Sequence, residues 1–377
     1  MEILGFTWNY IVVFLLVLTV LVFVHEWGHY WVARRNNVRV DVFSVGFGPE
    51  IYGWTDASGT RWKISAIPLG GYVKMFGESD DGDDPDAPVL SAEDKAVSFH
   101  YKTVGQRSAI VAAGPAVNFI FAIFAFAVLA GVVGNAVPLA AVGKVSQDSA
   151  AETAGFMPGD RFLAIDGENV KYFGDLRDIV SSSPNKAMNF LILRDEAELT
   201  LQATPKSAFR QNAEGIDTEV GLLGVEWNPE YVEYERQNPA MALWVGVQRT
   251  YFVTTNILYY IGDMITGQRG TDDLGGPLRI AQISGDMAKQ GFAEVILLMA
   301  MLSVNLGLIN LFPIPMLDGG HLAFYSIEAL FGKPLGAKAQ EYGFRFGLIL
   351  VLMLVVFVTW NDLVHLEVIE FIKGLVT

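Results

Sequence analysis

Two histidines and a glutamate near the N-terminus have the spacing of a metal-dependent hydrolase. His25, Glu26 and His29 form the pattern H-E-x-x-H. Residues at i and i+4 share one face of a helix, so both imidazoles can bind one ion, and the adjacent carboxylate can act as a base. The pattern directly follows the run Ile11–Val24, which is apolar except for Thr19. The sequence therefore predicts a zinc site within a membrane helix.

Two histidines leave such a site one protein ligand short, because a catalytic zinc usually takes three and keeps the fourth position for water. The chain has no cysteine, so the third ligand must be another histidine or a carboxylate. Asp318 is the best candidate, because it follows an apolar segment that Pro313 and Pro315 must break, and irregular backbone at membrane depth is tolerated where it lines a cavity. Two side chains remain as alternatives, His321 and Glu328.

The composition is that of an integral membrane protein. Apolar residues make up 52% of the 377 residues and charged residues 18%. The net charge of −15 argues against nucleic acid as a partner, because a phosphate-binding surface needs excess Lys and Arg. A helix needs about 20 residues to cross the bilayer. Four apolar segments meet that length and predict a polytopic α-helical protein with four transmembrane helices: residues 6–33, 108–134, 292–312 and 342–360.

Flanking basic residues predict the orientation of these helices. The first helix is followed by Arg34, Arg35 and Arg39, and Lys102 and Arg107 precede the second. Basic residues are enriched on the cytoplasmic side of a membrane. The loop at residues 36–103 is therefore expected to be cytoplasmic, and both termini external.

A fifth segment, Leu243–Gly267, is partly apolar but contains Gln248, Arg249, Asn256 and Asp263. Its composition favours a helix that lies on the outer membrane surface over one that spans. The number of spans supports the same interpretation. If this segment spanned, Asp318 would emerge on the side opposite to His29, and the two could not share one zinc.

The remaining stretches indicate strands and a compact domain. Alternating apolar residues at 40–48 and 61–75 predict a small sheet in the first loop. The segment after the second helix predicts a mixed α and β domain. The predicted organisation has four parts: residues 1–134 as the first half of the membrane core, 135–228 as the external domain, 229–291 as an interfacial helical linker, and 292–377 as the second half of the core.

Three further motifs accompany H-E-x-x-H. They are G-P-x-x-N ending at Asn118, N-x-x-P-x-x-x-L-D-G beginning at Asn310, and Pro68–Met75 in the first loop. With these motifs, nearly the whole chain resembles the site-2 protease family of intramembrane zinc metalloproteases, of the bacterial regulator of sigma-E protease type. The resemblance implies one zinc ion per chain, bound by His25, His29 and Asp318.

The resemblance also implies roles for the other motif residues. Glu26 is expected to be the catalytic base, and Asn118 and Asn310 to hold the substrate. The sheet of the first loop is expected to be membrane-associated and to pair with an unwound substrate through Gly70, Gly71 and Tyr72. The external segment resembles a PDZ domain at Ala154–Asp160 and Ile165–Gly167. It has room for one such domain, whereas the best-known enzymes of the group carry two.

The predicted function is hydrolysis of a peptide bond in the transmembrane segment of single-span proteins, such as anti-sigma factors, in regulated intramembrane proteolysis. The expected location is the bacterial inner membrane, with the PDZ-like domain and both termini on the periplasmic side. The expected partners are the lipid bilayer, the membrane-spanning substrate and a peptide C-terminus at the PDZ-like domain. The alternative is a catalytically silent membrane scaffold that recruits partners through that domain. A metal transporter is less favoured, because no relay of further intramembrane charges accompanies the site.

Overall fold

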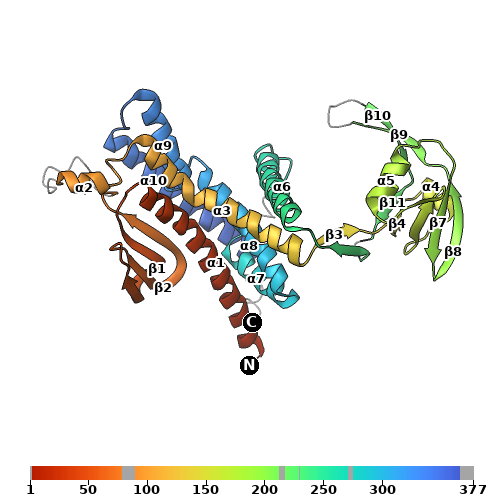
Figure 1. The fold of residues 1–377 in the computed structure, drawn as a ribbon, viewed down its shortest axis with the longest axis horizontal. Coiled ribbons are helices and arrows are strands. Elements are labelled where there is room, and N and C mark those ends of the chain that lie inside the picture. The colour runs from red at the N-terminus through yellow and green to blue at the C-terminus, as the bar shows by residue number, and fades with distance from the viewer. Residues whose placement is uncertain (1, 79–89, 212–216, 229, 271–274, 366–377) are drawn as a thin grey trace. The chain divides into compact units, whose positions relative to one another are not determined.

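The protein divides into two compact units. The computed structural model describes residues 2–78, 90–211, 217–228, 230–270 and 275–365 (Figure 1). The helical unit comprises Met1–Leu129 and Pro239–Thr377, and the strand-rich unit comprises Ala130–Asn238. The strand-rich unit is thus an insertion between the two halves of the helical unit.

Among the described residues, four helices are long and apolar enough to cross a membrane: α1 (Glu2–Arg35), α3 (Val104–Val132), α8 (Phe292–Leu311) and α10 (Ala337–His365). They contain the predicted segments 6–33 and 342–360 and all but the last one or two residues of 108–134 and 292–312. Their ends differ from the prediction because hydropathy marks only the apolar stretch. In α3, the side chain of Thr103 accepts from the Gln106 backbone N–H and the Gln106 side chain accepts from the Thr103 N–H, so the helix starts at Val104 rather than at residue 108.

Glycines allow α1 and α3 to come into contact. A Cβ at Gly28 would lie 2.5 Å from the backbone oxygen of Ala113, and a Cβ at Gly114 would overlap with the imidazole of His29. Small residues at helix contacts allow close approach of backbones in membrane proteins. The G-P-x-x-N segment is therefore in direct contact with the H-E-x-x-H pattern.

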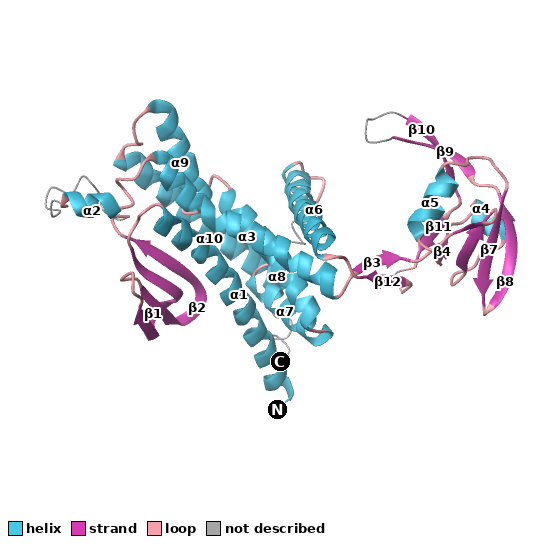
Figure 2. Ribbon diagram, in the orientation of Figure 1, coloured by secondary structure: helices cyan, strands magenta, loops and turns pink. Residues whose placement is uncertain are grey.

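The predicted strands of the first loop are present as β1 (Val40–Thr55) and β2 (Arg61–Met75) (Figure 2). Residues 42–45 pair on one side with residues 71–74 and on the other with residues 61–64, because both strands bend back on themselves. The result is a sheet of four extended segments. Phe43 is buried in a cluster with Ala33 of α1 and Ile110 of α3, which holds the sheet against both helices.

The fifth segment forms one long helix, α6 (Pro239–Ile265), which is not among the four candidate spans. Its buried face consists of Ala242, Gly246 and Thr250, and the Gly246 backbone packs directly on the Ile123 carbonyl of α3. Aromatic residues such as Tyr251 and Tyr259 are exposed on other faces. The position of α6 at the membrane surface remains a prediction.

Helix α7 (Pro277–Gln290) packs against both α1 and α10. The buried carboxylate of Asp362 on α10 accepts hydrogen bonds from the backbone N–H groups of Gly276, Leu278 and Arg279, at 2.8 to 3.1 Å. At the other contact, Tyr10 of α1 donates a 2.6 Å hydrogen bond to Asp286. Two shorter helices complete the helical unit, α2 (Ala92–Val97) and α9 (Asp318–Phe331).

The strand-rich unit contains a four-stranded sheet in the order β6-β5-β7-β8, with β5 at Arg161–Ile165, β6 at Glu168–Asn169, β7 at Met188–Arg194 and β8 at Ala197–Ala203. Two helices pack with it around a hydrophobic core, α4 (Ala150–Ala154) and α5 (Phe173–Ser181). Three antiparallel pairs make up the rest: β4 (Val142–Val145) with β11 (Val225–Trp227), β9 (Lys206–Gln211) with β10 (Asp217–Leu222), and β3 (Asn135–Pro138) with β12 (Val232–Glu235).

The β3–β12 pair modifies one predicted boundary. Residues 229–291 were expected to form a helical linker, but β12 lies in this stretch and pairs residue by residue with β3, from Val232 with Pro138 to Glu235 with Asn135. The strand-rich unit therefore extends to Asn238, and the helical part of the stretch begins at Pro239. Strand pairing over a long sequence separation carries no local signal, so residues 232–235 alone did not indicate this strand.

Candidate metal centre

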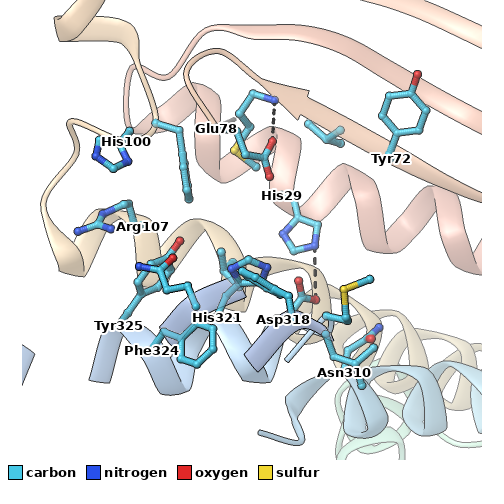
Figure 3. Close-up of a pocket in the computed structure, with 18 of the residues that line it drawn as sticks. His29, Tyr72, Glu78, His100, Arg107, Asn310, Asp318, His321, Phe324 and Tyr325 are labelled. Carbon is cyan, nitrogen blue, oxygen red and sulfur yellow. Dashed lines mark hydrogen bonds and ion pairs between the residues drawn. The ribbon is translucent and has the colours of Figure 1, made fainter. Parts of the chain in front are cut away.

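Three side chains from two helices converge in the helical unit, and Figure 3 shows two of them, His29 and Asp318, facing each other. The Nε2 atoms of His25 and His29 lie 3.2 Å apart. Asp318 Oδ2 lies 3.2 Å from His25 Nε2 and 3.6 Å from His29 Nε2. Tetrahedral coordination with zinc–ligand bonds of about 2.0–2.1 Å places donor atoms roughly 3.3 Å from one another. The three residues, here called the donor triad, therefore have the separations of three corners of a zinc tetrahedron.

The chemistry of the donor atoms also fits zinc. His29 Nδ1 lies 2.9 Å from the carbonyl oxygen of Ile110, which can only accept, so the proton sits on Nδ1 and Nε2 points its lone pair at the triad. Asp318 Oδ2 is buried and has no hydrogen-bond partner in the described part of the chain. A buried carboxylate oxygen without a donor is costly unless a cation compensates it. The donor triad is thus suited to hold a divalent metal.

Asp318 reaches the triad because the chain turns sharply after α8. Helix α8 ends at Leu311, and residues 312–317, which include both prolines, lead into α9. The backbones of Gly319 and Gly320 lie so close to Leu311 and Ile314 that a Cβ at either position would overlap with the carbonyl oxygens there. The D-G-G sequence therefore allows the first turn of α9 to fold back onto the end of α8.

Glu26 lies beside the triad. It lines the same cavity as His25, His29 and Asp318, a space of about 490 Å³. Strand β2 packs against this part of α1, because a Cβ at Gly71 would lie 2.9 Å from Cγ1 of Val22 and 3.4 Å from Cγ of Glu26. The carboxylate is therefore in a position to take part in chemistry at the metal.

The residues expected to contact the substrate lie in different places. Tyr72 lines the cavity, and Gly71 packs against α1. Gly70 has φ of +142° beneath the ring of Phe47, where only glycine fits without strain. Asn310 also lines the cavity. Asn118 does not, because it is 0% exposed and its amide lies on His25 Nδ1 at 3.0 Å.

The two alternatives to Asp318 lie outside the donor triad. His321 lines the cavity one helical turn beyond Asp318, and burial lowers its pKa. Glu328 lies further along α9 and forms a 2.6 Å ion pair with Arg107 at the start of α3, where both side chains are largely buried. Arg107 compensates Glu328, whereas the ion-pair partners of Asp318 Oδ2 among the described residues are the two imidazoles of the triad, with no Arg or Lys.

The chain is similar to a described protein family over most of its length. The family model "Peptidase family M50" matches residues 13–354. The "Putative zinc metalloprotease Atu1380" of Agrobacterium fabrum is 48% identical over 367 residues, which are 95% of this chain and 97% of the relative. "Metalloprotease MmpA" of Caulobacter vibrioides is 38% identical over 388 residues, 96% of this chain and 97% of the relative.

A solved PDZ domain of an SdrC-like protein from Listeria monocytogenes matches 24% of this chain and 87% of its own, at 16% identity and a TM-score of 0.19. At that score no argument about the fold of the strand-rich unit rests on it. The relatives, by contrast, match from end to end. The chain therefore belongs to peptidase family M50, the site-2 protease family, and is a multi-pass membrane zinc metalloprotease.

Proposed function

We propose that this protease hydrolyses a peptide bond inside the membrane-spanning segment of single-span proteins, with anti-sigma factors as one substrate class. The observation that carries the proposal is the depth of the donor triad. His25 and His29 belong to the candidate span Tyr10–Arg35, and both are buried. Ionisable groups at membrane depth are rare and mark functional sites. A scissile bond that reaches this site must itself be within the bilayer.

In this proposal the donor triad binds one zinc ion per chain. The chemistry that zinc supplies when bound is Lewis acidity, which activates water and polarises a carbonyl at neutral pH. Glu26 accepts the proton of the attacking water and passes it to the leaving amine. The position of Glu26 next to His25 in sequence, and on the cavity wall with it, supports this role.

A substrate helix must unwind to expose its carbonyl, and the released backbone groups then need partners. Residues 71–75 form an outer segment of the sheet, and Tyr72, Val73 and Met75 line the cavity. We propose that the unwound substrate adds to this segment as a further strand, through Gly70, Gly71 and Tyr72. Asn310 on the cavity wall holds the substrate amide. Exposed apolar residues elsewhere on the sheet support its contact with lipid: Ile51, Tyr52, Trp54 and Leu69.

The strand-rich unit acts in this proposal as a PDZ-like domain that binds or filters the external part of the substrate, with a peptide C-terminus as its ligand. Its own hydrophobic core supports an independent domain. The enzyme resides in the bacterial inner membrane, with this unit and both termini on the periplasmic side. Basic residues in the last turn of α1, Arg34 and Arg35, support a cytoplasmic position for that end.

The test is cleavage of a purified single-span reporter by the wild type and by Glu26→Gln, with zinc content measured in both. Glutamine keeps the shape of the side chain but cannot accept the proton. We expect Glu26→Gln to retain zinc and to cleave about 10²- to 10⁴-fold more slowly, the usual contribution of a general base. Equal cleavage by both proteins would exclude the assignment. Zinc in the wild type without cleavage of any single-span reporter would favour the scaffold.

A further inference from the structure

Asn118 is held rigidly between two helices. Its side chain is 0% exposed. Its backbone carbonyl accepts a 2.8 Å hydrogen bond from Ser303 of α8, and its amide lies 3.0 Å from Nδ1 of His25 on α1. It does not line the cavity that contains Glu26 and the donor triad. A substrate in that cavity would therefore meet His25 and not Asn118.

The amide has one described side-chain partner, His25. The other end of the amide, assigned as Oδ1, is buried and has no hydrogen-bond partner among the described residues. An amide can present its oxygen or its nitrogen to a neighbour by turning half a revolution about its last side-chain bond. Which end of Asn118 faces the ring therefore depends on which nitrogen of neutral His25 carries the proton, Nδ1 or Nε2.

A metal at the donor triad requires one of the two arrangements. If the Asn118 nitrogen donates to Nδ1, then neutral His25 carries its proton on Nε2, which lies 3.2 Å from both His29 Nε2 and Asp318 Oδ2. A protonated Nε2 cannot bind a metal. If the Asn118 oxygen accepts from Nδ1–H, Nε2 has a free lone pair, as His29 has through the Ile110 carbonyl.

We propose that Asn118 is a positioning residue that accepts a hydrogen bond from His25 Nδ1–H through its side-chain oxygen and so fixes the metal-binding tautomer of His25. The inference rests on the proposed zinc site and gives Asn118 a role other than contact with substrate. Helix α3 then supplies both outer acceptors, the Ile110 carbonyl for His29 Nδ1–H and the Asn118 side-chain oxygen for His25 Nδ1–H. Groups that orient metal-binding histidines typically change metal affinity by about 10- to 100-fold when removed.

The test compares Asn118→Asp and Asn118→Leu in the purified full-length protein. Aspartate can accept the hydrogen bond and leucine cannot, and both are close to asparagine in size. Zinc affinity is measured by competition with a chromogenic chelator, and the geometry of the site by the visible spectrum of the Co²⁺ form. We expect Asn118→Leu to bind zinc about 10- to 100-fold more weakly and Asn118→Asp to stay within about tenfold of the wild type. At saturating zinc, KM for the reporter should be unchanged in Asn118→Asp.

Two results would overturn the inference. One is zinc affinity in Asn118→Leu equal to that of the wild type. The other is Asn118→Asp as weak as Asn118→Leu, because a carboxylate accepts as the proposed oxygen does. If Asn118→Leu does not elute as a folded protein, the zinc affinity of Asn118→Asp alone tests the inference. An affinity within about tenfold of the wild type supports it, and a larger loss contradicts it. His25→Ala separates the two proposals: a wild type that binds zinc no better than His25→Ala would refute the zinc site itself.

Discussion

Gly114 brings α3 into contact with both imidazoles of the donor triad. A Cβ at this position would overlap with His29 Nε2 and lie 2.8 Å from His25 Cε1. The neighbouring residues of α3 then place the Ile110 carbonyl and the Asn118 amide on the outer nitrogens of the two rings. One missing side chain therefore allows two hydrogen bonds that orient the site.

Gly114→Ala tests this contact, and Gly105→Ala is its matched control on the same helix. A Cβ at Gly105 would have no heavy atom within 4 Å. We expect Gly114→Ala to lose most of its zinc affinity, since the added methyl group would overlap with Nε2 of His29, one of the three donor atoms. Gly105→Ala should bind zinc normally and gain up to about 1 kcal/mol of stability from reduced chain entropy. Wild-type zinc affinity in Gly114→Ala, measured by chelator competition, would contradict the described contact.

The sequence indicated the members of the donor triad, but not the groups that orient them. The i and i+4 spacing on a helix brings His25 and His29 together wherever the helix lies, and the proline break made Asp318 the best third candidate. The Ile110 carbonyl and the direction of Asn118 depend on the rotation of α3 about its axis. An apolar helix that can face lipid or protein on all sides gives no signal of that rotation.

At the scale of elements, α7 is held at its start by a residue far along the chain. Asp362 of α10 accepts from three backbone N–H groups at the N-terminal end of α7. A carboxylate at this place satisfies donors that a helix start leaves unpaired, and it interacts favourably with the helix dipole. A Cβ at Gly276 would lie 2.7 Å from that carboxylate, so glycine is needed there.

Asp362→Ala should destabilise the helical unit by roughly 1–3 kcal/mol, because one buried and two partly buried N–H groups lose their acceptor. Hydrogen exchange of α7 amides, followed by mass spectrometry, should become faster, while exchange in α3 is unchanged. The control is Asp263→Ala, which removes a partly exposed ion pair with Arg269 and should cost at most about 1 kcal/mol. Unchanged protection of α7 in Asp362→Ala would show that this cap does not hold the helix.

The elements that could be predicted are those whose signal is local. Length and apolarity indicated α1, α3, α8 and α10, and alternation indicated β1 and β2. Helix α7 was predicted only as an undivided part of the helical linker at residues 229–291, because it mixes polar and apolar residues and its start is stabilised by Asp362, which is distant in sequence. The bends that divide the β1–β2 hairpin into four segments, and the β3–β12 pair, also depend on long-range contacts.

At the scale of the whole molecule, the proposed orientation in the membrane rests on the basic residues that flank the apolar helices, and an even number of spans between His29 and Asp318 only keeps these two residues on the same side. Because the chain has no cysteine, single cysteines can report this orientation directly. Thr204→Cys lies in the strand-rich unit and Glu93→Cys in α2, and both positions are exposed. In intact spheroplasts, a membrane-impermeant maleimide should label Thr204→Cys, and it should label Glu93→Cys only after lysis. The opposite pattern would reverse the proposed orientation.

The site of cleavage tests the central claim most directly. The wild type, reconstituted in liposomes with a single-span reporter, should release two products, and mass spectrometry should place both new termini within the apolar segment of the reporter. Glu26→Gln should give neither product. New termini only in the flanks outside the apolar segment, or the same products from Glu26→Gln, would contradict hydrolysis within the membrane at the donor triad.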